Sequence, residues 1–174
     1  MKHLSDSRLR LIASSGLVSG AVLGMAGTFA PSASLRGLAW GLDGVALIVA
    51  AALLTMHHFR HGNDAAAAGF LVFVVGEGLI LSAAAMDPVA SAPSFAAGVS
   101  LWAAALVLIS ASTAVPLLVK AVGFAGSLLF SVVAVEIFLG NALTPLSRPL
   151  PFFAYPFLAA TLFGWAWVHY RNAA

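Results

Sequence analysis

The chain has 174 residues, of which 61% are hydrophobic and only 8% carry a charged side chain. Soluble domains carry about 25% charged residues, so this composition cannot cover a water-facing surface. The formal net charge of +2 is too small and too scattered for a nucleic acid partner, and the absence of cysteine excludes disulfides and thiolate metal sites. The remaining class is an integral membrane protein, whose immediate partner is the lipid bilayer.

Long apolar runs separated by short polar segments predict an all-α membrane protein: a bundle of six transmembrane helices with short loops, forming a single domain over residues 1–174. We expect the spans at about 11–30, 36–56, 65–86, 94–110, 115–140 and 152–169. The number falls to five if the N-terminal segment is a cleaved signal peptide, because its basic start, apolar centre and small residues near position 33 fit that interpretation too.

Basic residues are distributed unevenly between the expected loops. With six spans and both termini inside, the cytoplasmic side holds Lys2, Arg8, Arg10, Arg60, Lys120 and Arg171. Only Arg36 and Arg148 lie outside. The positive-inside rule therefore predicts cytoplasmic N and C termini, in a bacterial inner (plasma) membrane.

The third expected span carries one carboxylate, Glu77, close to its middle. A charge at that depth costs at least about 2.5 kcal/mol on insertion scales. The residues one helical turn away on the same helix are apolar, so Glu77 needs a proton, a partner on another helix or a water-filled cavity. We therefore expect this protonatable acid to have a functional role.

Two more acids lie within expected spans: Asp43 in the outer half of the second, and Glu136 toward the outer end of the fifth. Arg36 precedes Asp43 by about 10 Å along the helix, at about 1.5 Å per residue, and is its candidate partner. These four residues predict a polar path in a cavity that opens outward, with Glu77 at its floor, although the position of Glu136 near the interface also fits a structural role. The leading hypothesis is a small carrier or channel-like protein for a small solute or ion.

Histidines form a second group. His57 and His61 share a helix face if the second helix continues past residue 56, Asp64 follows them, and His169 ends the last span. Imidazole and carboxylate groups bind zinc and other divalent metals, and histidine also holds haem iron. The alternative hypothesis is thus a membrane-bound redox or metal-dependent enzyme. We favour polar caps of an interfacial loop, with no cofactor and no enzymatic activity.

Glycines at positions 16, 20 and 24 form a GxxxGxxxG series in the first span. Gly16, Gly20 and Gly24 lie on one helix face, which lets another helix approach closely. A third hypothesis is therefore a non-catalytic membrane subunit or assembly factor that docks a partner subunit through this face. A homo-oligomer also stays open, because six helices enclose little volume.

Overall fold

The computed structural model describes residues 6–84, 86, 88–113 and 115–173. This part of the chain is all-helical, with α1 (Asp6–Thr28), α2 (Ala33–Arg60), α3 (Asp64–Ala84), α4 (Pro88–Ala111), α5 (Leu117–Phe138) and α6 (Tyr155–Arg171). The predicted helical membrane fold is confirmed: helices α1 to α5 are each long and apolar enough to cross a membrane. Helix α6 has only 17 residues, which corresponds to roughly 25 Å.

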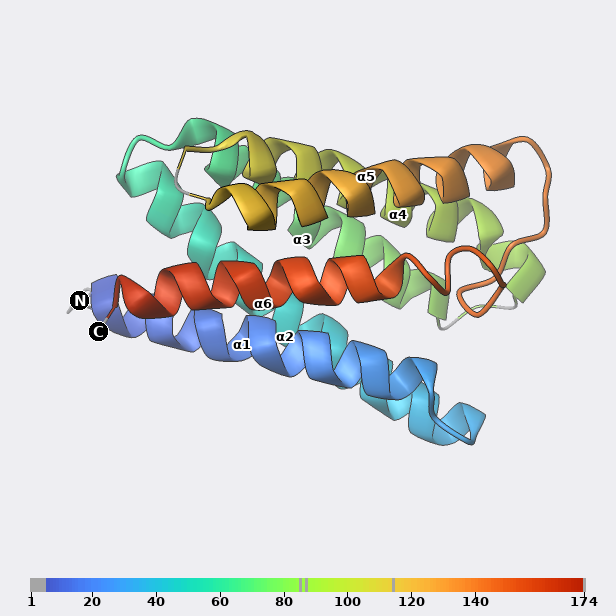
Figure 1. Ribbon diagram of the computed structural model, residues 1–174. Coiled ribbons are helices and arrows are strands. Elements are labelled where there is room, and N and C mark those ends of the chain that lie inside the picture. The colour runs from blue at the N-terminus through green and yellow to red at the C-terminus, as the bar shows by residue number, and fades with distance from the viewer. Residues whose placement is uncertain (1–5, 85, 87, 114, 174) are drawn as a thin grey trace.

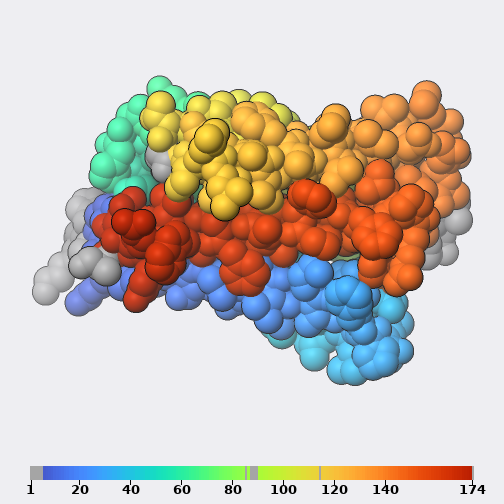
Figure 2. Space-filling model, in the orientation of Figure 1, coloured from blue at the N-terminus to red at the C-terminus, as the bar shows by residue number. Residues whose placement is uncertain are grey.

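Helices that are consecutive in the chain pack side by side, and α6 also packs against α1. The described helices therefore form a closed ring with alternating chain direction. The N and C termini lie at the same end of the bundle, which we call the terminal end (Figure 1). At the opposite end, which we call the far end, the tip formed by the end of α1 and the start of α2 projects from the body (Figure 2).

Local signals set the bounds of α2. The Ser32 side chain accepts a hydrogen bond from the backbone N–H of Leu35 at 3.3 Å and so caps the first turn. The helix then continues past its expected end at residue 56 to Arg60. Gly62, with a φ of 67°, makes the turn to α3 because glycine adopts this left-handed conformation without steric cost. His57 and His58 therefore belong to the helix rather than to a loop.

Aromatic side chains fill the interior of the ring about halfway along the bundle and toward the terminal end. Phe73 stacks on Trp102 at 6.1 Å between ring centroids, and Trp102 and Phe130 form a T-shaped pair at 5.4 Å. Trp165 meets Phe70 and Phe73 edge-on at 5.2 and 6.1 Å. All five are buried, and the edge-on and stacked geometries are those that aromatic pairs prefer. We call Phe70, Phe73, Trp102, Phe130 and Trp165 the aromatic plug.

Helices α3 and α4 approach closely through glycines. A Cβ atom at Gly76 would lie 3.0 Å from the carbonyl oxygen of Gly98 and 3.0 Å from Cβ of Leu101. Gly78 lies two residues further along the same helix, and a Cβ atom there would meet nothing within 4 Å. Because Gly76 has no side chain, α4 can pack closely against α3 next to the following residue, Glu77.

We expect Gly76→Ala to lower the free energy of unfolding by about 1–3 kcal/mol, because the added methyl group overpacks a backbone contact. Gly78→Ala is the matched control and should be neutral or slightly stabilising, because alanine favours the helix and meets no neighbour. Detergent-denaturant unfolding followed by circular dichroism measures both. Equal stabilities of the two variants would contradict this packing of α3 on α4.

Candidate functional site

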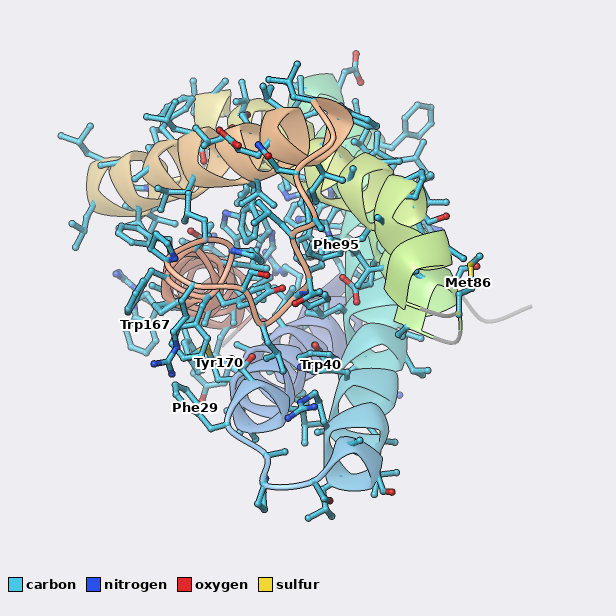
Figure 3. The ribbon with its side chains drawn as sticks, turned by 90° about the vertical axis from the view of Figure 1, so that its right-hand side faces the viewer. Phe29, Trp40, Met86, Phe95, Trp167 and Tyr170 are labelled. Carbon is cyan, nitrogen blue, oxygen red and sulfur yellow. The ribbon has the colours of Figure 1, made fainter. Side chains whose placement is uncertain are left out.

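A partly open cavity of about 500 Å³ lies in the half of the ring nearest the far end. Its walls come from the parts of α1, α2, α3, α4 and α6 near that end, together with residues 144–146 of the loop before α6. Most of the lining is apolar. Trp40 of α2 and Phe95 of α4 point into the middle of the ring, whereas Trp167 and Tyr170 lie on its outer side (Figure 3). Asp43 and Glu77 both line the cavity.

Glu77 lies at the cavity floor. It is the lining residue of α3 farthest from the far end, and the residue is only 2% exposed. The indole of Trp102, the top of the aromatic plug, lies beside its carboxyl group. Oε2 of Glu77 and Nε1 of Trp102 are both buried, and neither has a partner with hydrogen-bond geometry. A buried acceptor without a donor is costly, and the indole N–H of Trp102 is the neighbouring group that interacts with this carboxyl group.

Asp43 lies nearer the far end than Glu77, and its carboxylate lies against the glycines of α1. A Cβ atom at Gly24 would lie 2.7 Å from Oδ2 of Asp43, and one at Gly20 would lie 3.1 Å from Oδ1. Oδ1 is buried and has no hydrogen-bond partner. The carboxyl groups of Asp43 and Glu77, together with the Tyr155 hydroxyl, are near enough to interact electrostatically. Two acids and a phenol thus share one low-dielectric space.

The glycine series of α1 faces α2 of the same chain. A Cβ atom at Gly16 would lie 2.9 Å from Cβ of Ala50, and one at Gly27 would lie 2.4 Å from the indole of Trp40. These glycines therefore pack α1 on α2 at the terminal half and make room for Asp43 and Trp40 at the far half. Helix α2 of the same chain therefore covers the glycine face of α1 that was expected to be available to a partner subunit.

Arg36 lies nearer the far end than Asp43 on α2, and it also lines the cavity. Its Nη2 donates a hydrogen bond to the carbonyl of Ala30 at 3.3 Å, and its guanidinium lies 5.9 Å from the centroid of the Trp40 ring. The Trp40 indole in turn donates to the Gly24 carbonyl at 3.2 Å. In this part of the described chain Arg36 bonds to backbone and stacks on an indole, and it forms no ion pair with Asp43.

Glu136 is separate from this group. Its carboxylate accepts a hydrogen bond from the side chain of Asn141, and its carbonyl accepts one from the Asn141 backbone at 3.0 Å. It therefore closes the C-terminal end of α5, and no residue of α5 is among the described residues that line the cavity.

The expected histidine group lies at the terminal end with a different acid. His57 and His61 are joined by Asp6 of α1: Nδ1 of His57 lies 2.8 Å from Oδ1 of Asp6, and Nε2 of His61 lies 4.0 Å from its Oδ2. Asp64 is exposed at the start of α3 and is not part of this cluster. His169 pairs with His58 at 3.0 Å between their Nε2 atoms, too close for a haem iron between the two rings.

A double-mutant cycle tests the fit of Asp43 against α1. Gly24→Ala should destabilise the protein by about 1–3 kcal/mol, because the new methyl group displaces the carboxylate. In an Asp43→Ala background the same change should cost at least about 0.5 kcal/mol less. Unfolding free energies in detergent provide the measurement.

Gly41→Ala is the control on α2, since a Cβ atom there meets nothing within 4 Å, and its effect should be additive with Asp43→Ala. An additive result for Gly24→Ala would contradict the contact between Gly24 and Asp43.

The chain matches no family model, no curated protein sequence and no solved structure. The ring of apolar helices is compatible with a polytopic membrane protein. Its function therefore has to be inferred from the cavity and the side chains that line it.

Proposed function

We propose that this protein is a small membrane carrier that binds an organic cation of modest size in the far-end cavity. The observation that carries the proposal is a pair of acids, Asp43 and Glu77, that line one cavity and that each have a buried carboxyl oxygen, Oδ1 and Oε2, without a hydrogen-bond partner. A cationic group supplies what both oxygens lack, since an ion pair in a low-dielectric site is stronger than at a surface.

The rest of the lining fits the apolar part of such a ligand. A volume of about 500 Å³ lies within the usual range for small-molecule pockets, about 300–1,000 Å³. Trp40, Phe95, Trp102 and Tyr155 line the cavity, and aromatic faces attract ammonium groups. Apolar walls with a few convergent polar groups are typical of small-molecule sites, and such walls offer no ligands to an inorganic ion.

A carrier is favoured over an open channel because the aromatic plug closes the cavity on the side of Glu77 that faces the terminal end. Trp102 belongs to both the cavity wall and the plug, and Phe70, Phe73, Phe130 and Trp165 are fully buried behind it. A solute that reaches Glu77 can pass only if helices move relative to one another, as in alternating access. With both termini cytoplasmic, as the basic residues predict, the described cavity faces the outside.

Benzyltrimethylammonium provides a suitable probe, with its uncharged isostere neopentylbenzene and the anion benzenesulfonate for comparison. We expect calorimetric titration of the detergent-purified protein to detect binding of the cation only. Glu77→Gln and Asp43→Asn should each weaken that binding at least about tenfold, because each removes about 1.4 kcal/mol or more of charge pairing. Glu136→Gln is the matched control outside the cavity and should bind as the wild type does.

Counterflow of labelled benzyltrimethylammonium into proteoliposomes tests the transport step separately. The carrier proposal predicts exchange by the wild type and Glu136→Gln proteins but not by Glu77→Gln. Binding without exchange would contradict the carrier and leave the cation site intact. Equal binding of the three probes, or none, would overturn the cation site itself.

A further inference from the structure

We propose that Asp6, His57 and His61 form a binding site for a divalent transition metal ion at the terminal end of the bundle. Asp6 lies in the first turn of α1, His57 lies in the last turn of α2, and His61 is the C-cap residue that follows α2. Each offers one ligand atom, and these atoms lie within 4.8 Å of one another. The site is at the opposite end of the ring from the cavity and is independent of the proposed carrier function.

The orientation of the His61 ring points to a cation. Its Nδ1 lies 2.7 Å from the carbonyl oxygen of His57, and a carbonyl only accepts hydrogen bonds, so Nδ1 carries the proton. In the neutral ring Nε2 then holds a lone pair, and it faces a carboxylate oxygen of Asp6 at 4.0 Å. This pair is satisfied either by a second proton on the imidazole or by a metal ion between the two groups, and the Nδ1 bond is the usual support of a metal-bound histidine.

The distances also fit metal coordination. Zinc bonds to imidazole nitrogen and carboxylate oxygen are about 2.0–2.2 Å long, so two ligands of one ion lie within about 4.4 Å of each other. Oδ1 of Asp6 lies 2.8 Å from Nδ1 of His57, and Oδ2 of Asp6 lies 4.0 Å from Nε2 of His61. The three ligand atoms lie within 4.8 Å of one another, so a small side-chain shift brings all of them within reach of one ion. His57 loses the Nδ1 proton to bind, and the other ring nitrogen takes it up. Two imidazoles and one carboxylate are a ligand set for Zn²⁺ or Fe²⁺ with open positions left over.

The surroundings set access and affinity. The side chains of Asp6 and His61 are 40% and 54% exposed, whereas that of His57 is only 10% exposed. An ion can therefore reach the site from solvent and bind beside a buried imidazole. The Arg10 guanidinium lies 3.5 Å from Oδ2 of Asp6. It competes for the same oxygen, and we therefore expect metal binding to be moderate rather than very tight.

Zinc titration against a chromophoric competitor tests the site, on full-length protein whose affinity tag has been removed. We expect one Zn²⁺ per chain in the wild type and no binding of Mg²⁺, which prefers oxygen ligands. His61→Ala and Asp6→Asn should weaken zinc binding at least about tenfold. Arg60→Ala, an exposed neighbour on the same turn, should leave it unchanged, and so should His169→Ala.

A second readout does not depend on the competitor. Added Zn²⁺ should raise the unfolding temperature of the wild type and of Arg60→Ala but not that of Asp6→Asn, since an ion that binds only the folded state stabilises it. No saturable zinc binding by the wild type would show that Asp6 forms only ion pairs and would overturn the proposal. Zinc binding that survives His61→Ala but is lost in His169→Ala would overturn it as well.

Discussion

The burial of the Glu77 carboxyl group is the constraint on which the rest of the structure depends. An acid in the middle of an apolar helix is tolerated only where the protein supplies a proton, a partner or a cavity. Here the ring of six helices provides a cavity above the residue and the Trp102 indole beside it. Close contact between α3 and α4 at Gly76 holds that indole in place, since a Cβ atom there would lie 3.1 Å from Cδ1 of Trp102.

The ring divides into two halves with different packing. Toward the terminal end, aromatic rings and histidines fill its middle: Phe70 stacks on His58 at 5.4 Å, and His58 bonds to His169. Toward the far end the glycines of α1 replace side chains, which leaves space for Asp43 and for the cavity. The small residues of α1 therefore have two roles: they bring helices close, and they leave room for a polar group.

Much of the fold could be predicted from the sequence, because hydropathy reports the membrane environment of each segment directly. The site could be predicted only in part. The depth of Glu77 follows from its place in an apolar run, but the contact of Asp43 with Gly24 depends on the rotation of α1 against α2, which no local pattern contains. The same rotation brings Asp6 rather than Asp64 to the histidines. Helix α6 begins at Tyr155 rather than near 152 because residues 151–154 form turns.

The most direct test of the central claim is the reactivity of a single cysteine in the cavity wall, which the cysteine-free chain makes simple. Ala159 of α6 lines the cavity, and Ala159→Cys can be treated with a trimethylammonium or a sulfonate methanethiosulfonate of similar size. A cavity whose two buried acids select cations predicts faster modification by the cationic reagent, with the preference reduced when Glu77→Gln is added. Equal rates for the two reagents, or a preference that Glu77→Gln does not change, would contradict this account.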